Sequence, residues 1–489
     1  MPAASIRGSI VEKQTGKPLA RSLVVAQPVP GTRGATRSAR TNPNGLFEIA
    51  DVPAGLYIVT ASKTGFVPTE YGQKRWFSAG LPVKVLEDVP APVKIALPHF
   101  GAVTGRVVDE NNLGISGFTV MAYRNSRPPV LVGKSSTDDR GVYRIGGLMP
   151  GFYLTRTDNL ESDVGNYRAT FGNETLSVDA ASTAEVVLDQ DTLGADIRPL
   201  RGLAVSVSGQ VMRSGSARGP ATVTLVNDMG QLNTSSESGR FQFEHLATGP
   251  VELLAQASDR QLGPLEGYLS FDLQGSRGVQ LEVAPLPSVQ FHFVDTSGRA
   301  VDPATLPVLI RRMEISGPGA ATYLTLDGQR QSRLRAGRWE LAVAPNADWY
   351  AADFSGPGRE RSPEMAAGWN EIVVDPRGSA PEVKFVLSSE TRTLHGTVTY
   401  EDVPVAGAPV HLEAFNAHTG RRIRDLRTMR SDVNGRFSFA GLAPGSYRLL
   451  ASFDYLAPET SQMTKAGALE IVIGESRDTV RDLKLWSME

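Results

Sequence analysis

Apolar and polar residues alternate along short stretches of this chain, and turn-forming residues separate one stretch from the next. In the segment GRFSFAGL, Phe437 and Phe439 fall on one side of an extended backbone, while Arg436 and Ser438 fall on the other. This two-residue period predicts β-strands with one buried face. No stretch shows a sustained helical period. Short strands between Gly-, Pro-, Asn- and Asp-rich turns predict an all-β protein built from β-sandwiches.

One sequence frame recurs along the chain. It consists of a glycine, an alternating strand, a small turn, a tyrosine in most copies, and a second strand. Intact copies begin at Gly45, Gly141, Gly239 and Gly435, and a degraded copy begins at Gly328. A second glycine follows in each intact copy, at Gly55, Gly151, Gly249 and Gly445. We expect these eight glycines to occupy turns, several of which need a positive φ.

The repeat is about 97 residues long, which is the size of one independent domain and too long for a solenoid repeat. The chain is therefore predicted to contain about five homologous β-sandwich domains, and the fourth is the degenerate one. Their predicted bounds are 1–98, 99–200, 201–287, 288–389 and 390–489.

The predicted domain boundaries leave almost no linker. Pro98, Pro199 and Pro287 mark three of them, and flexible Gly/Ser linkers are absent. Neighbouring domains are therefore expected to pack end to end. The resulting shape is predicted to be a rod or a gently curved arc, with any bend at the fourth repeat, where the spacing is irregular.

The motif G-x-V-x-D followed by TDDRGVYRIGGLMPGFYLT resembles the carboxypeptidase regulatory-like domain. The resemblance implies transthyretin-like (prealbumin-like), seven-stranded Greek-key sandwiches related to the B-type repeats of collagen adhesins. It is good in repeats 1, 2 and 5, fair in repeat 3 and weak in repeat 4. The segment GFVPTEYGQKRW is similar to exported multi-repeat proteins of soil acidobacteria. The resemblance specifies the fold well and the function poorly.

Composition excludes several classes of site. The formal net charge is −2, which argues against a nucleic-acid-binding face. The chain has no cysteine, which excludes disulfides, thiolate nucleophiles and Cys-ligated metals. No apolar run is long enough for a membrane span. The start, MPAASIRGSIVEK, lacks the features of a signal peptide, and we interpret it as a trimmed chain.

Metal and catalytic motifs are not found. The nearest cluster of metal-ligating residues is His411, Glu413 and His418, which we interpret as solvated strand and loop residues. The sequences TNPNG, TDDRG and SDVNG resemble half of a calcium loop, but Asx turns at their Asn or Asp explain them equally well. The chain shows neither a nucleophile elbow nor a phosphate-binding loop. We expect no enzyme activity, no cofactor and no bound metal.

A spontaneous Lys–Asn crosslink of the adhesin type is also rejected. Lys13 lies near the matching first strand, but the final strand PVKIALP has no Asn.

Aromatic residues outside the repeated frame are the remaining candidates for ligand contact. Tyr71 and Trp76 lie in the polar connection YGQKRWFSAG, and Trp349 and Tyr350 lie in PNADWYAADF. Exposed Trp and Tyr rings stack on sugars, so these residues are candidate glycan contacts. They are also candidate anchors that fix the loops onto their own or a neighbouring domain.

The sequence therefore favours a non-enzymatic, secreted, periplasmic or cell-surface protein that acts as a structural spacer, an adhesin-like module or a protein-interaction module. Two alternatives stay open: a carbohydrate-binding protein that uses the exposed aromatic loops of repeats 1 and 4, and an accessory fragment of a larger outer-membrane or surface assembly. The expected partners are proteins or polysaccharides at the cell surface, without nucleic acid or a membrane span.

Overall fold

The computed structural model describes the chain except for residues 1–3, 88, 127–128, 163–164, 214–215, 218, 261, 315–316, 345–347, 358–365, 376–380, 475 and 488–489. Buried apolar side chains form a main core in each of five consecutive β-sandwich units, here numbered 1 to 5 in chain order. The prediction of an all-β array of tandem sandwiches is confirmed.

The strands of each unit follow one another in a similar order. Unit 1 contains β1 (Ile6–Glu12), β2 (Leu23–Pro28), β3 (Arg37–Arg40), β4 (Leu46–Ile49), β5 (Gly55–Ser62), β6 (Thr69–Glu70), β7 (Val83–Val85) and β8 (Ala91–Leu97). Unit 2 contains β9 (Gly101–Arg106), β10 (Thr119–Arg124), β11 (Val130–Ser136), β12 (Val142–Leu148), β13 (Gly151–Thr157), β14 (Leu160–Ser162), β15 (Gly165–Tyr167), β16 (Thr183–Val186) and β17 (Asp191–Thr192). Unit 3 contains β18 (Val205–Arg213), β19 (Ser216–Ala217), β20 (Ala221–Asn227), β21 (Gly230–Ser236), β22 (Arg240–Leu246), β23 (Gly249–Asp259), β24 (Gly263–Leu273), β25 (Arg277–Glu282) and β26 (Ala284–Pro285).

Units 4 and 5 add short helical segments. Unit 4 contains β27 (Ser288–Asp295), the 3₁₀ turn η1 (Pro303–Thr305), β28 (Val308–Glu314), β29 (Gly317–Pro318), β30 (Thr322–Tyr323), β31 (Gln331–Arg333), β32 (Gly337–Val343), β33 (Tyr350–Ser355), β34 (Asn370–Val374) and β35 (Glu382–Ser388). Unit 5 contains β36 (Arg392–Tyr400), β37 (Val403–Pro404), β38 (Pro409–Phe415), β39 (Arg427–Arg430), β40 (Arg436–Leu442), β41 (Gly445–Ala451), α2 (Thr460–Lys465), β42 (Leu469–Ile473), β43 (Asp478–Val480) and β44 (Leu483–Lys484).

The first strand of every unit pairs in parallel with a strand at the end of the same unit. The pairs are β1–β8, β9–β17, β18–β25, β27–β35 and β36–β43. The second sheet is built on an antiparallel pair, namely β2–β5, β10–β13, β20–β23, β28–β32 or β38–β41. Because the parallel strands run in the same direction, the chain enters a unit at one end and leaves it at the other.

A glycine in the first strand makes this parallel pairing possible in four units. A Cβ on Gly8 would lie 1.7 Å from the Val93 carbonyl oxygen of the paired strand. The corresponding distances are 2.1 Å at Gly105, 2.1 Å at Gly209 and 1.9 Å at Gly396. An aromatic ring of the antiparallel neighbour packs over the same glycine, from Phe47, Tyr143, Phe241 or Phe437.

In unit 4 the aromatic residue lies on the first strand, and the antiparallel neighbour contributes no aromatic ring at the position opposite it. Phe291 stands at the glycine position of β27 and is fully buried, while the backbone of Arg330 stands opposite it. The aromatic ring therefore comes from the first strand instead of from its antiparallel neighbour. This exchange explains why the degenerate repeat lacks the glycine and still keeps an aromatic core.

The recurrent tyrosine fixes the turn that precedes it. Its hydroxyl donates to the carbonyl oxygen four residues earlier, over 3.0 Å from Tyr57, 2.6 Å from Tyr153 and 2.8 Å from Tyr447. In unit 4 the Nε1 of Trp339 makes the same bond to the carbonyl of Arg335, over 2.8 Å. Burial raises the pKa of Tyr447 to about 12, so its hydroxyl keeps the proton that it donates.

The Asn and Asp residues of the calcium-like sequences form Asx turns. One side-chain oxygen of Asn42, Asp138 or Asp432 accepts bonds from the backbone N–H groups two and four residues later. Asp327 does the same in the degenerate repeat. All eight glycines that the sequence predicted to lie in turns have positive φ values.

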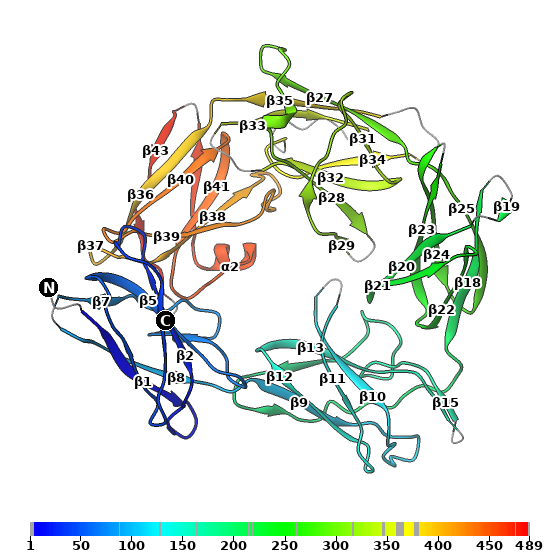
Figure 1. Cartoon of the computed structure of the whole chain (residues 1–489), viewed down its shortest axis with the longest axis horizontal. Helices are drawn as coiled ribbons and strands as arrows, with labels where there is room; N and C mark the ends of the chain where they lie inside the picture. Colours follow the sequence, from blue (N-terminus) through cyan, green and yellow to red (C-terminus); the bar gives the residue numbers. More distant parts are fainter. Residues whose placement is uncertain are drawn as a thin grey trace.

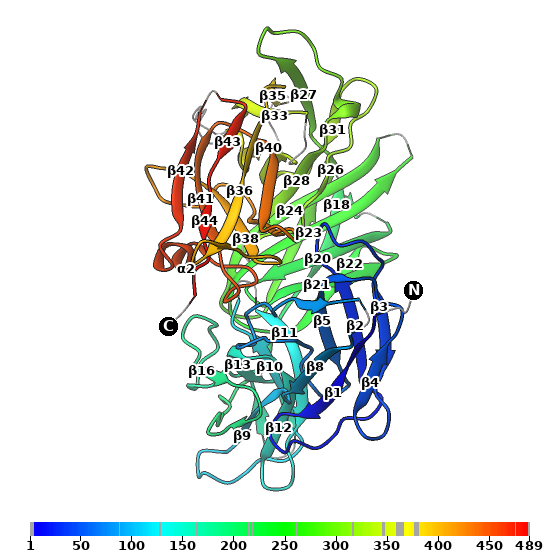
Figure 2. The ribbon, with the colours of Figure 1, turned by 90° about the vertical axis from the view of Figure 1, so that its left-hand side faces the viewer.

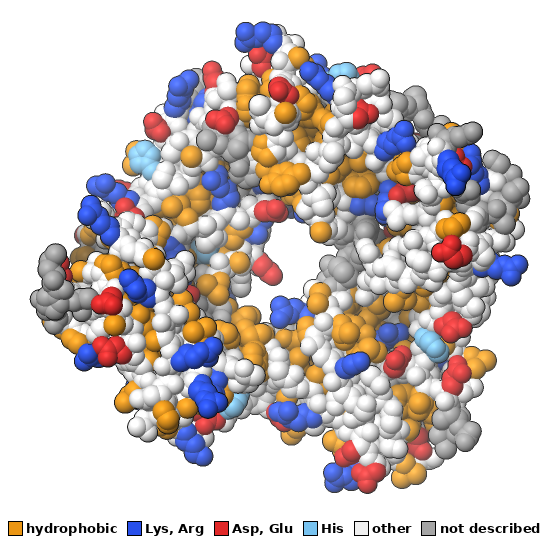
Figure 3. Space-filling view, in the orientation of Figure 1, with side chains coloured by type: hydrophobic (Ala, Val, Ile, Leu, Met, Phe, Trp, Pro, Cys, Tyr) orange, Lys and Arg blue, Asp and Glu red, His pale blue; other side chains and the backbone are white. Residues whose placement is uncertain are grey.

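The units form a closed ring, and the expectation of a rod or gently curved arc is therefore wrong. Figure 1 shows consecutive units turning in one sense until unit 5 lies against unit 1, and Figure 3 shows the opening in the middle. Figure 2 views the ring from the side on which units 1 and 5 meet. The turn is distributed over the whole ring and is not concentrated at unit 4.

The ring arises because neighbouring units make non-covalent contacts with each other in addition to being joined by the chain. In four units a long segment follows the second strand of the antiparallel pair, and we call its described residues the junction loop. These segments are residues 63–82 with β6 in unit 1, 158–182 with β14 and β15 in unit 2, 344–369 with β33 in unit 4 and 452–468 with α2 in unit 5, without residues 163–164, 345–347 and 358–365. In unit 1 the Phe66 ring lies 4.1 Å from the His99 ring at the start of unit 2. In unit 2 the amide of Asn159 donates to the His245 carbonyl of unit 3 over 3.1 Å.

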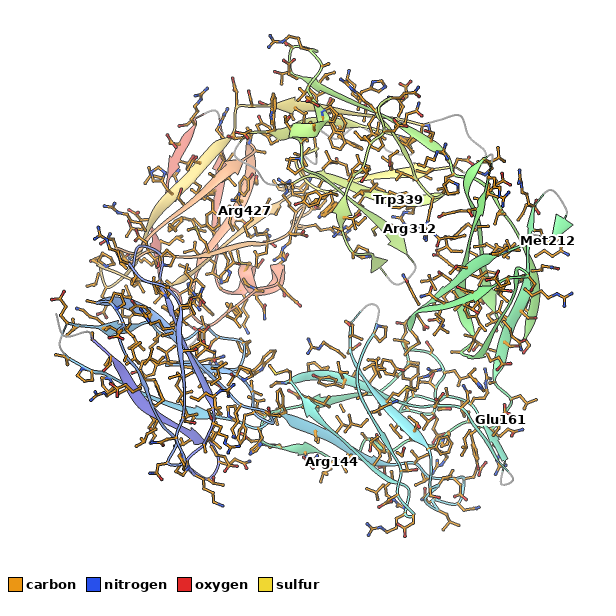
Figure 4. The ribbon with its side chains drawn as sticks, in the orientation of Figure 1. Arg144, Glu161, Met212, Arg312, Trp339 and Arg427 are labelled. Carbon is orange, nitrogen blue, oxygen red and sulfur yellow. The ribbon has the colours of Figure 1, made fainter. Side chains whose placement is uncertain are left out.

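The later junctions use contacts of the same kind. Between units 3 and 4, Arg335 bonds to Glu266 over 2.9 Å, and Arg312 lies over the ring of Tyr268. Figure 4 labels Arg312 beside Trp339, its neighbour on the paired strand of unit 4. Between units 4 and 5, the backbone N–H of Trp369 donates to the Ile423 carbonyl over 3.1 Å. Units 1, 2 and 4 thus contact the next unit through their junction loops, whereas unit 3 does so through Glu266 and Tyr268 of β24.

We expect Gly435→Val to destabilise unit 5 by about 1–3 kcal/mol through backbone strain. Gly435 has a φ of 75°, and a Cβ there would lie 2.9 Å from the Val398 carbonyl oxygen. Differential scanning calorimetry should show a lower transition for unit 5 alone. Gly474→Val is the matched control, because no atom lies within 4 Å of a Cβ at that exposed position. An unchanged profile, or an equal shift of all five units, would contradict this account.

Candidate interaction site at the junction of units 1 and 5

The ring closes where two stretches of unit 1 meet unit 5. Unit 1 contributes the turn after β2 and its junction loop, and unit 5 contributes the end of β39, its junction loop and the segment after β44. The backbone N–H of Ala79 donates to the Phe453 carbonyl over 2.6 Å, and that of Val433 donates to the Pro30 carbonyl over 3.2 Å. These bonds fix the two backbones relative to each other at two separate points.

Opposite charges meet across this junction. Arg430 of unit 5 donates to Glu70 of unit 1 over 3.1 Å, and both side chains are about one-quarter exposed. The same Glu70 oxygen accepts the backbone N–H of Gly80 over 2.6 Å, which orients the carboxylate. Arg75 of unit 1 lies 3.8 Å from the mostly buried carboxylate of Asp454.

Aromatic rings form the apolar part of the junction. Phe77 of unit 1 stacks on Tyr455 of unit 5 at 6.3 Å between centroids, and Tyr455 stacks on Trp486 at 5.6 Å. Trp76 packs edge-on against Phe77 at 5.4 Å. These rings extend a small core made with Met463 of α2. Unit 5 therefore binds unit 1 by apolar burial as well as by charge.

The candidate aromatic residues lie in different places and are not brought together. Tyr71 packs on the core of unit 1, and Trp349 packs on the core of unit 4. Trp76 stays 41% exposed beside the ring closure. Tyr350 lines a cleft of about 440 Å³ between units 4 and 5. Their contact with glycans stays a prediction.

The comparisons with known proteins find a family likeness in two units. Residues 5–97 and 393–474 match the carboxypeptidase regulatory-like domain. Units 1 and 5 are therefore the parts of the chain that are similar to this domain. They are also the two units that meet at the ring closure.

Solved structures show likeness at low identity. The minor pilin GBS52 of Streptococcus agalactiae is 14% identical over 41% of this chain and 97% of its own, with a TM-score of 0.27. A streptococcal ancillary pilin is 14% identical over 57% of this chain and 99% of its own, with a TM-score of 0.20. BcpA, the major pilin subunit of Bacillus cereus, is 12% identical over 79% and 99%, with a TM-score of 0.14. A comparison with curated proteins finds no match. TM-scores this low give no basis for transferring a role.

Two ionisable residues beneath the ring closure are fully buried, which corrects their interpretation as solvated. Glu413 of unit 5 accepts bonds from Arg422 over 2.7 Å, Arg448 over 3.2 Å and Thr460 over 2.5 Å. It therefore ties α2 and the junction loop to β38. The signal in the sequence was the dense run of arginines after β38.

His411 is the second buried residue. Its Nδ1 lies 3.0 Å from the Thr428 hydroxyl, and burial lowers the pKa of His411 to about 4. His418 is exposed in the following turn, so the three candidate ligands are not grouped. Within the part of the chain that the structure describes, no three metal-ligating side chains cluster. No helix among those residues is long and apolar enough to cross a membrane.

We expect the free energy of unfolding of unit 5 to fall as the pH drops from about 6.5 to about 4. The unfolded imidazole takes up a proton in this range while buried His411 stays neutral, so protonation favours the unfolded state. The limiting slope is about 1.4 kcal/mol per pH unit, or about 3 kcal/mol in total. Urea unfolding at pH 7 and pH 5 measures it. His411→Gln should remove this part of the slope and His418→Gln should not, and equal slopes in both variants would refute the assignment.

Proposed function

We propose that this chain is a non-enzymatic interaction scaffold, exported or held at a cell surface, whose ring of β-sandwiches presents loops to protein partners. The observation that carries the proposal is the specific closure of unit 5 on unit 1. Hydrogen bonds, two ion pairs and stacked rings fix unit 5 relative to unit 1. Fixing surfaces in space serves recognition, because a preorganised surface loses less entropy on binding.

The closed shape favours an interaction role over a spacer role. Five units in line would span about 180 Å, since strands of five to ten residues set the length of each unit. A ring of the same units spans much less distance and presents all five units around one opening (Figure 3). The adhesin-like role and the role of an accessory part in a larger surface assembly are both compatible with this geometry.

A carbohydrate-binding function is the second candidate, and the cleft between units 4 and 5 favours it. Tyr350 lines this cleft together with Phe415, Asn416 and His418. Its volume of about 440 Å³ lies within the range of small-ligand sites. Aromatic faces beside an amide and an imidazole suit the C–H and hydroxyl groups of a sugar.

The two functions predict different binding experiments with the fluorescently labelled chain. The scaffold predicts retention on intact bacterial cells that is lost after the cells are treated with protease. The carbohydrate alternative predicts hits on a polysaccharide array that Tyr350→Ala abolishes and Tyr323→Ala preserves. Tyr323 is the matched control because it is a 68% exposed tyrosine of the same unit. A blank array excludes the carbohydrate function, and protease-resistant retention on cells contradicts the protein-binding scaffold.

A further inference from the structure

The contact that closes the ring is not backed by a covalent link. Consecutive units are joined by the chain itself, whereas unit 5 meets unit 1 through side chains and backbone hydrogen bonds alone. The contact nevertheless follows the pattern of the other junctions. The junction loop of unit 5, through Phe453 and Tyr455, lies on unit 1 in the way that other junction loops lie on the next unit.

The two sides of this contact are different and complementary. Unit 1 contributes Glu70 and Phe77, while unit 5 contributes Arg430 and Tyr455. Such a head-to-tail contact is heterologous, because it joins two unlike surfaces. A heterologous contact closes a ring when it forms within one molecule, and it makes a dimer or a longer series when it forms between molecules.

The closing contact is also incompletely packed. A cleft of about 340 Å³ lies between the two units, with walls that include Leu81 of unit 1 and Tyr400, Phe453 and Trp486 of unit 5. This cleft is open to solvent, so the atoms that line it contact water and not the opposite unit. Because units 1 and 5 each have a buried core of their own, the closure can open while both units stay folded.

We propose that unit 5 of one copy docks on unit 1 of a second copy through the same surfaces that close the ring. The partner is thus a second copy of this chain. Closure within a molecule benefits from an effective concentration on the order of millimolar. Closed monomers therefore dominate in dilute solution, and joined copies form where the protein is crowded, as on a densely covered surface.

Engineered cysteines test the proposal directly, because the chain has no cysteine of its own. One copy carries Pro30→Cys and another carries Val433→Cys, at positions whose backbones are hydrogen-bonded across the closure. Neither substitution alters the ion pair between Glu70 and Arg430 or the one between Arg75 and Asp454. With a short bismaleimide, the mixture should accumulate crosslinked dimers at a rate that rises with protein concentration. A single chain carrying both changes should give a crosslinked monomer.

The control for random collision is a mixture of the Val433→Cys copy with a Glu244→Cys copy, because Glu244 is exposed on unit 3. At least about tenfold more dimer is expected from the Pro30→Cys mixture than from this control. If the Pro30→Cys mixture and the Glu244→Cys control gave equal dimer yields at all concentrations up to about 1 mM protein, docking between copies would be overturned. A doubly substituted chain that fails to crosslink internally would overturn the closure itself.

Charge reversal provides a second, independent test. Arg430→Glu and Glu70→Arg each place like charges across the closure, and the double variant restores opposite charges. Analytical ultracentrifugation should show the two single variants as separate monomers that form dimers when mixed. The double variant should remain a closed monomer. Sedimentation of the mixture as the unchanged sum of its parts would contradict joining through these surfaces.

Discussion

The contact between unit 5 and unit 1 is the constraint on which the overall shape depends. Each sandwich is held together by its own core, and the chain connects one unit to the next. The contacts at the other four junctions curve the array, and the closure, with Glu70 paired to Arg430 and Phe77 stacked on Tyr455, joins its two ends. Without the closure, no contact would hold the last unit against the first.

The sandwich fold could be predicted because its signals are local. Alternation such as Phe437 and Phe439 against Arg436 and Ser438 identifies strands, and glycine before the strand identifies the turn. The degenerate repeat shows where such reasoning stops. The sequence reveals that unit 4 lacks the first-strand glycine, but only the strand register shows that Phe291 takes over the space of the aromatic ring across from it.

The ring and the candidate site could not be predicted because they depend on contacts between distant segments. The junction loops do not share a sequence frame, so the repeat carries no record of the direction in which they turn the chain. His411 and Glu413 fall in a strand that reads as half solvated. Both are buried, and Glu413 is covered by Arg422 after β38 and by Thr460 of α2, which lie outside the repeated frame.

The repeats also explain how one domain type can carry different roles. Units 1 and 5 keep the family pattern and supply the closing surfaces, while unit 4 has exchanged part of its core and lines the cleft beside Tyr350. A common sandwich thus supports different junction loops, and the loops decide what each unit contacts. The function proposed for the chain follows from this division between scaffold and loops.

Small-angle X-ray scattering of the dilute chain tests the closed ring most directly. Five sandwiches of about 35–40 Å closed into a ring should give a maximum dimension below about 100 Å. The pair-distance distribution should fall to zero near that value at every concentration below the millimolar range. A maximum dimension near 180 Å would show an extended array and would contradict the closure of unit 5 on unit 1.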